Sequence, residues 1–160
     1  MRFRDKAAIS SISSAVISIL NLPVNSEDME RYRKKVLVCM CRELENFVVL
    51  RKSVAAQAEA DRLGIGDLAR FRYSDRKSKK MGGDSSIFYF EHVVPVSSLV
   101  DELMALESPT LEAVAAIIGK ADVAWITWDE NVALDSNKTR SNRPNPLEAY
   151  EKAKIELCPD

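Results

Sequence analysis

Ile87-Phe88-Tyr89-Phe90-Glu91-His92-Val93-Val94-Pro95 is the stretch that decides the fold, because it joins an aromatic run, an acid–histidine pair and a proline stop. Aromatic residues at alternate positions are typical of a strand, and this one brings Phe88 and Phe90 to one face. His92 is the only histidine in the chain. If the protein performs acid–base chemistry with an imidazole near neutral pH, it must use His92. The other interpretation is a hydrogen-bonded histidine that closes a strand.

A basic stretch, Arg70 to Lys80, lies just before this strand. It holds six cations within eleven residues, although the formal net charge of the whole chain is -1. Concentrated positive charge favours a polyanion, and Phe71 and Tyr73 can stack on bases if they are exposed. The alternatives are a strand with both aromatics inward, or a solvated lysine-rich loop. The predicted nucleic-acid contacts, in this stretch and in the polar tail, are Arg70, Arg72, Arg76, Lys77, Lys79, Lys80, Lys138, Arg140 and Arg143.

Composition limits the class of protein. With 160 residues, of which 46% are hydrophobic, the chain can bury one substantial core, so we expect a single domain. A sequence pI of about 6.0 argues against a wholly electrostatic nucleic-acid binder. The chain has three cysteines, Cys39, Cys41 and Cys158, which are too few for a tetrahedral zinc site, so no structural zinc is expected. So sparse a set of cysteines also predicts a reduced, cytoplasmic setting. The serine-rich start, residues 7–22, is too polar to span a bilayer.

Hydrophobic periodicity predicts a helical first half and a mixed second half, and hence the α+β class. The first half is expected to hold a helix that carries Ile9 to Leu20 and is broken at residues 21–24, and then one long or two consecutive helices from the Ser26 region to about Leu63, ended by Gly64 and Gly66. The second half is expected to hold two helices between Pro95 and Gly119, a strand over 122–127, a helix from Trp128 and a last helix from Pro146. Thr127 and Glu130 have the spacing of a capping box.

The strand ending in Glu91-His92-Val93-Val94-Pro95, the later strand, and a helix opening with Thr127-Trp128-Asp129-Glu130-Asn131 resemble the ββα-metal, or His-Me finger, core of HNH-type endonucleases. In that superfamily the acidic residue before the histidine helps to bind a divalent metal and the histidine activates water. The resemblance implies that Glu91 is a catalytic metal ligand and His92 the general base. Asn131 is the best match for the ligand on the helix, with Asp129 and Glu130 as competitors.

This resemblance spans residues 70–136. The chain differs from the superfamily in two ways: a segment long enough for about two helices separates the two strands, and the zinc-binding cysteine pairs of many members are missing. It predicts a ββα-like core with a helical insertion over 67–136, following a helical part, 1–66, and preceding a basic loop and helix, 137–160. Pairing of the two strands is expected to set the helix at Trp128 beside the exit of the histidine strand. Glu91 and Asn131 would then face one ion.

The sequence therefore predicts a metal-dependent endonuclease that hydrolyses phosphodiester bonds. Its expected cofactor is Mg²⁺ or another divalent cation such as Mn²⁺ or Ca²⁺, because carboxylate and amide oxygens suit hard ions. Its expected partner is nucleic acid, with DNA favoured, and no membrane partner is expected. The N-terminal helices could also support a homodimer or a protein partner. Two alternatives are open: a non-catalytic nucleic-acid-binding module and a helical adaptor or inhibitor.

Overall fold

The computed structural model describes residues 6–81, 87–136, 143 and 145–159. They form a mixed α+β structure, mostly helical, with a small three-stranded sheet, as the sequence predicts for the class. The chain divides into two compact units, each built from two separate segments. The helical unit comprises residues 1–48 and 94–121, and the sheet unit comprises residues 49–93 and 122–160.

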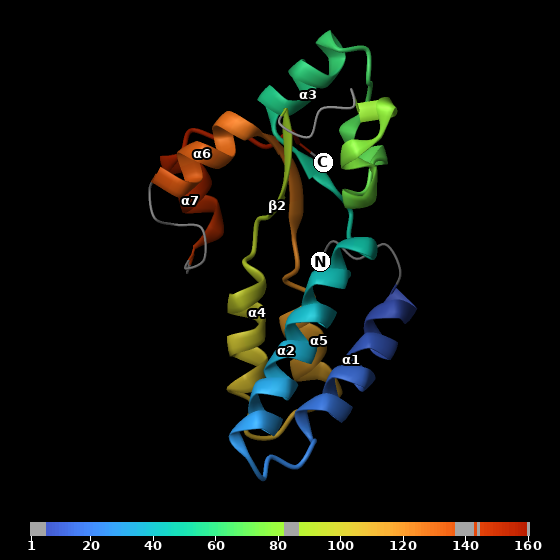
Figure 1. The fold of residues 1–160 in the computed structure, drawn as a ribbon, viewed down its shortest axis with the longest axis vertical. Coiled ribbons are helices and arrows are strands. Elements are labelled where there is room, and N and C mark those ends of the chain that lie inside the picture. The colour runs from blue at the N-terminus through green and yellow to red at the C-terminus, as the bar shows by residue number, and fades with distance from the viewer. Residues whose placement is uncertain (1–5, 82–86, 137–142, 144, 160) are drawn as a thin grey trace. The chain divides into compact units, whose positions relative to one another are not determined.

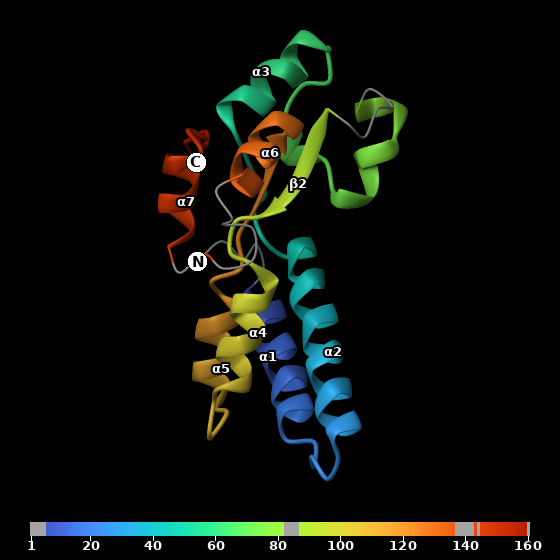
Figure 2. The ribbon, with the colours of Figure 1, turned by 60° about the vertical axis from the view of Figure 1, so that its left-hand side comes forward.

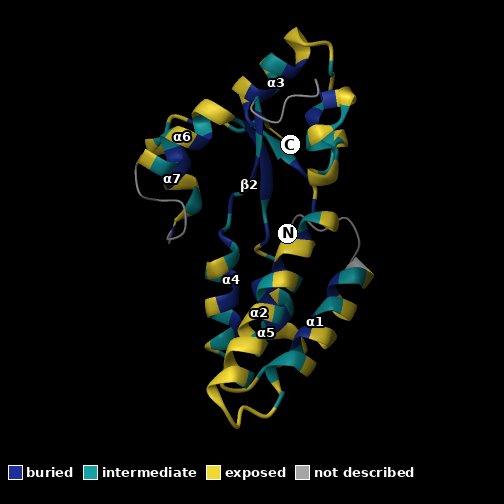
Figure 3. Ribbon diagram, in the orientation of Figure 1, coloured by how far each residue is buried: buried dark blue, intermediate teal, exposed yellow. Residues whose placement is uncertain are grey.

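The helical unit holds four α-helices that run alongside one another (Figures 1 and 2): α1 (Lys6–Leu20), α2 (Glu27–Glu43), α4 (Val96–Met104) and α5 (Leu111–Ile118). Here α1 packs against α5 and α2, and α2 packs against α4. Each helix turns its apolar residues inward, including the fully buried Leu37, Leu103 and Ile118, while its other side is exposed (Figure 3). The helical insertion between the two strands therefore folds together with the N-terminal helices.

The segment predicted as one or two helices up to Leu63 contains two, with a strand between them. Ser26 caps α2, as predicted, by accepting a hydrogen bond from the Met29 backbone at 3.2 Å. After α2 come a 3₁₀ turn, η1 (Leu44–Asn46), strand β1 (Arg51–Lys52) and helix α3 (Val54–Arg62). The sequence gives no sign of β1, because two cationic residues carry no hydrophobic alternation. Gly64 and Gly66 end α3 with left-handed backbones, at φ 69° and 83°.

The sheet of the sheet unit has the order β1-β3-β2. Its other strands are β2 (Phe88–His92) and β3 (Val123–Thr127). Strand β3 is central: it pairs with β1 in parallel and with β2 antiparallel, in a register that sets Phe88 opposite Thr127 and His92 opposite Val123. The two strands predicted from the sequence are therefore neighbours.

Helix α6 (Trp128–Ser136) follows β3 without a break. Thr127 and Glu130 form the predicted capping box: the Thr127 N–H donates to Glu130 Oε2 at 2.7 Å, and the Glu130 N–H donates to Thr127 Oγ1 at 3.2 Å. The expected position of this helix was wrong, however. The Trp128 N–H donates to the Ile87 carbonyl at 3.0 Å, so α6 starts beside the first residue of β2 and not beside its exit. Antiparallel pairing carries β3 back to the beginning of β2.

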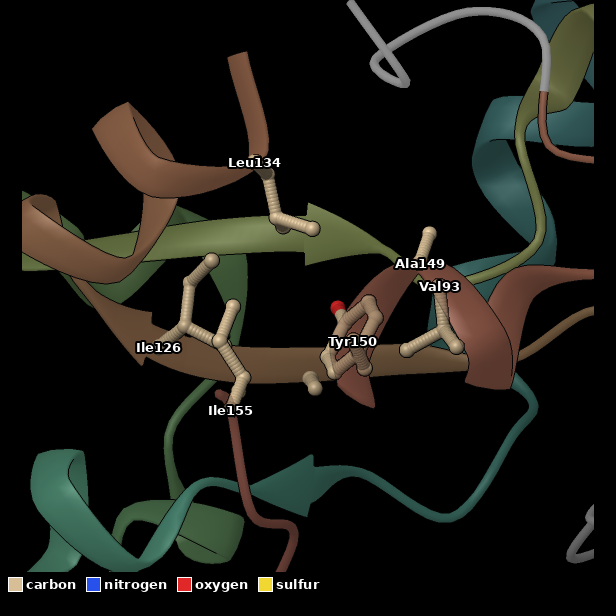
Figure 4. Close-up of a cluster of buried hydrophobic side chains, with 7 residues drawn as sticks. Val93, Ile126, Leu134, Ala149, Tyr150 and Ile155 are labelled. Atoms are coloured by element: carbon tan, nitrogen blue, oxygen red, sulfur yellow. The ribbon is translucent and has the colours of Figure 1, made fainter. Parts of the chain in front are cut away.

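Alternation along the strands divides the sheet into two faces. On the helix-covered face, α6 and the last helix, α7 (Pro146–Lys152), pack on β2 and β3. Figure 4 shows the buried cluster formed there, which consists of Val93, Ala124, Ile126, Leu134, Ala149, Tyr150 and Ile155.

The opposite, aromatic face carries Phe88, Phe90 and Trp125. It contacts the basic stretch, which forms short 3₁₀ turns, η2 (Leu68–Arg70), η3 (Tyr73–Lys77) and η4 (Lys79–Met81), in place of a strand. Trp125 anchors this stretch by donating its indole N–H to the Phe71 carbonyl at 3.1 Å. Within the described part of the chain, the helices are too short or too polar to cross a membrane.

Candidate functional site at the end of strand β2

His92 is the last residue of β2 and is half-buried on the aromatic face. Its ring lies 6.4 Å from that of Phe90, edge to face at 87°. The Phe90 ring in turn lies 4.8 Å from the Trp125 ring and 5.7 Å from the Tyr73 ring. A continuous series of rings therefore connects the imidazole with the basic stretch.

The basic stretch presents both positive charge and an aromatic ring to solvent. Tyr73 is 43% exposed, and the Arg76 guanidinium carbon lies 3.8 Å above the centre of its ring, an arrangement of the cation–π kind. The Arg72 N–H donates to Asp75 Oδ2 at 2.7 Å, which fixes the first turn. The exposed cations of the stretch are Arg70, Lys77, Lys79 and Lys80. Of the predicted contacts in the tail, Lys138 and Arg140 lie outside the described residues.

Glu91 projects to the helix-covered face, because adjacent residues of a strand point to opposite sides. Its carboxylate Oε1 lies 2.6 Å from Arg143 Nη1, and both side chains are buried, with 8% and 1% exposed. Arg143 Nη1 also donates to the His92 carbonyl at 3.4 Å. A buried carboxylate requires such a partner, since burial strongly disfavours an isolated charge. Arg143 therefore does not fit its predicted place on the nucleic-acid surface.

The three candidate ligands on α6 have different surroundings. Asn131 is buried, with 3% exposed, and lies one turn before Leu134, which packs in the cluster on the helix-covered face. Glu130 Oε2 accepts hydrogen bonds from the Thr127 N–H and, at 2.6 Å, from the Ser53 hydroxyl. Asp129 is exposed. Asn131 is therefore the buried member of the set, whereas Glu130 is held by the fold.

Tyr150 is a polar residue in the buried cluster of the helix-covered face, and it was not predicted as a site residue from the sequence. Its side chain is 2% exposed and projects from α7 into the cluster (Figure 4), and its hydroxyl has no hydrogen-bond partner in the described structure. Burial raises the pKa of Tyr150 well above its ordinary value, and the negative charge of Glu91 raises this pKa further. An aromatic residue in a short amphipathic helix gives no sequence signal beyond that of a core position.

The donor set can be tested against the divalent ion that the resemblance implies. Among the described residues, no group of three or more histidine, cysteine, aspartate and glutamate side chains could hold a metal. Mg²⁺, however, commonly takes only one or two protein ligands and keeps several waters. The oxygens of Glu91 and Asn131 are of the kind that Mg²⁺ prefers, but the Glu91 carboxylate is already neutralised by the buried Arg143 guanidinium, so these surroundings do not fit a divalent ion. An ion at Glu91 would share its carboxylate with Arg143.

Comparison of the chain with protein-family models, with curated proteins and with solved structures found no match.

Proposed function

We propose that this protein is a metal-dependent endonuclease of the ββα-metal type, which hydrolyses phosphodiester bonds in nucleic acid with His92 as the general base. The observation that carries the proposal is the ring series from Tyr73 through Phe90 to His92. It joins the only imidazole to the most concentrated group of cations in the sheet unit, on one face of the sheet. Phosphodiester hydrolysis needs both a base for water and positive charge near the phosphate.

Each group has a defined part in this reaction. The exposed cations Arg70, Lys77, Lys79 and Lys80 bind backbone phosphates. His92 accepts the proton of the attacking water. Arg143 holds the end of β2 through the Glu91 carboxylate and the His92 carbonyl, so that the imidazole keeps its position. The divalent cation that the resemblance assigns to Glu91 and Asn131 would lie on the helix-covered face, across the sheet from His92, so the chemistry at the phosphate falls to His92 and the exposed cations.

Replacement of His92 by alanine is the direct test. We expect His92→Ala to lower the cleavage rate by about 10² to 10⁴, the usual contribution of a general base, with an unchanged far-UV circular dichroism spectrum. Cleavage of plasmid DNA, single-stranded DNA and RNA is measured with Mg²⁺ and with Mn²⁺. Glu151→Ala, at an exposed position of α7, is the matched control. Full cleavage by a folded His92→Ala protein would contradict the proposal.

One observation favours a second candidate, a nucleic-acid-binding module that does not cut. The Glu91 carboxylate is already neutralised by Arg143, as expected of a structural ion pair on the same scaffold. This candidate predicts binding through the basic stretch that does not depend on divalent ions. Wild-type protein that binds nucleic acid but leaves every substrate intact with Mg²⁺ and Mn²⁺ would support it over the nuclease.

A further inference from the structure

Two side chains of the basic stretch, Tyr73 and Arg76, are fixed against each other at the surface. The Arg76 guanidinium carbon lies 3.8 Å from the centre of the Tyr73 ring, and Arg76 Nη1 donates to the Tyr73 carbonyl at 3.0 Å. Phe90 supports the same ring from the sheet, at 5.7 Å between ring centres, yet 43% of Tyr73 is exposed. The fold therefore holds this Tyr73–Arg76 pair in place while leaving much of it open to solvent.

The surroundings of the pair indicate its ligand. Single exposed aromatic residues are common and need no explanation, but this one is followed directly by the exposed lysines Lys77, Lys79 and Lys80. Aromatic rings and guanidinium planes both stack on nucleobases, and neighbouring cations neutralise the backbone phosphates. A positively charged surface with a stacking ring is typical of proteins that bind single-stranded nucleic acid.

A duplex makes much less use of this surface. Inside a double helix both faces of a base are covered by its neighbours, and exposing one costs the free energy of unstacking. Proteins read a duplex by placing an α-helix or a two-stranded ribbon in the major groove, whereas η2, η3 and η4 of the basic stretch are short 3₁₀ turns. The lysines can contact the phosphates of either form, but the Tyr73–Arg76 pair can stack only on an unpaired base.

We propose that the substrate of this protein is single-stranded nucleic acid, one unpaired base of which stacks on the Tyr73–Arg76 pair while neighbouring phosphates contact the lysines. This inference rests on the proposed function and deepens it by naming the substrate class. The rings of Tyr73, Phe90 and His92 form one series. A strand held at the pair therefore lies on the face of the sheet that carries the imidazole.

Binding in the presence of EDTA tests the proposal separately from cleavage. Fluorescence anisotropy measures the affinity of the full-length protein for a single-stranded DNA oligonucleotide, for RNA of the same sequence and for the DNA duplex. We expect tighter binding of single strands than of the duplex by about tenfold, the order of one base stack. This preference should widen as salt is raised, because duplex binding depends more steeply on salt than single-strand binding does.

Variants of the pair separate stacking from charge. Tyr73→Leu should lower the affinity for single strands by about 5- to 100-fold and leave the affinity for the duplex unchanged. Arg76→Lys keeps the charge but removes the planar guanidinium, so it should weaken single-strand binding without changing the salt slope. Tyr73→Phe keeps the ring and should bind as the wild type does. Tyr32→Leu, at a position of α2 that is 54% exposed, is the matched control.

Three results would overturn the inference. Equal affinity of the wild type for single strands and duplex would refute the preference and leave the nuclease proposal standing. Equal loss of single-strand and duplex binding in Tyr73→Leu would mean that the ring only supports the fold of the basic stretch. Absence of binding to all three nucleic acids would refute the inference and the proposed function together.

Discussion

Arg143 determines the arrangement of two residues at the end of β2. One of its nitrogens, Nη1, lies 2.6 Å from the Glu91 carboxylate and 3.4 Å from the His92 carbonyl. Both side chains of the pair are buried, so their mutual attraction offsets part of the cost of removing each charge from water. The residue that positions the candidate base is thus separated from it by 51 positions in the sequence.

We predict that Arg143→Met destabilises the protein by roughly 3–5 kcal/mol, because it removes the buried cation that lies 2.6 Å from the buried Glu91 carboxylate. Urea unfolding measures the change. The double variant Glu91→Gln/Arg143→Met should lose less than the sum of the two single variants, since it removes both charges of the pair. Arg31→Met, which removes an arginine whose side chain is 75% exposed, should change stability by about 0.5 kcal/mol or less. A stable Arg143→Met protein would mean that the ion pair contributes little.

The faces to which the side chains of Glu91 and His92 project can be predicted from the sequence alone. Glu91 was expected to hold the ion and His92 to act as the base beside it, yet strand alternation alone indicates that the two side chains project to opposite faces. The Glu91–Arg143 pair could not be read in this way. It joins β2 to a residue that follows α6, and a single sequence carries no sign of a contact over that separation.

At the scale of elements, the basic stretch is held against the sheet by two contacts of different kinds. The Trp125 indole N–H donates to the Phe71 carbonyl, and the Tyr73 ring packs beside Phe90. Its lysines, which do not take part in these contacts, face solvent. The stretch therefore combines a fixed backbone with exposed cations, which suits phosphate binding.

We predict that neutralising Lys77 and Lys79 together, as Lys77→Gln/Lys79→Gln, weakens nucleic-acid binding and reduces its dependence on salt. Each lost phosphate contact removes about one unit from the slope of log K against log salt concentration, so the slope should fall by about two. Fluorescence anisotropy over a salt series measures it, with the catalytically impaired His92→Ala background preventing cleavage. The control is Lys35→Gln/Arg42→Gln, which removes the same charge from exposed positions of α2. An unchanged slope would show that the stretch is only a solvated loop.

Elements with a local signal were predicted well. Helices α1 and α4 follow from apolar periodicity, α5 follows from the cap and proline before it, and α6 follows from the capping box of Thr127 and Glu130. Strand β1 was missed because its two residues are defined only by pairing with β3. The 3₁₀ turns of the basic stretch were missed because a short aromatic and cationic segment fits a strand, a loop or a turn equally well.

At the scale of the whole molecule, both compact units are discontinuous in the sequence. The helical unit takes α1 and α2 from the N-terminal segment and α4 and α5 from residues 94–121, while the sheet unit takes β3, α6 and α7 from the last part of the chain. No single cut therefore separates one unit from the other.

We predict that a shortened chain of residues 1–93 does not unfold cooperatively, although it contains more than half of the sequence. It lacks α4 and α5, on which α2 and α1 pack, and it lacks β3, which holds β1 and β2 in one sheet. Thermal unfolding followed by circular dichroism is the measurement, with the full-length protein as the control. A sharp transition in the shortened chain would mean that one unit is complete without its second segment.

The central position of β3 also sets the order of events during synthesis. Both edge strands leave the ribosome before the strand that joins them, because β1 and β2 precede β3 in the chain and pair only with it. Until residue 127 has emerged, the aromatic residues Phe88 and Phe90 have no sheet partner, and the nascent chain carries an apolar strand with free edges. In this interval α4 and α5 can already fold onto α1 and α2, which brings the ends of the intervening segment closer and lowers the entropy cost of closing the sheet.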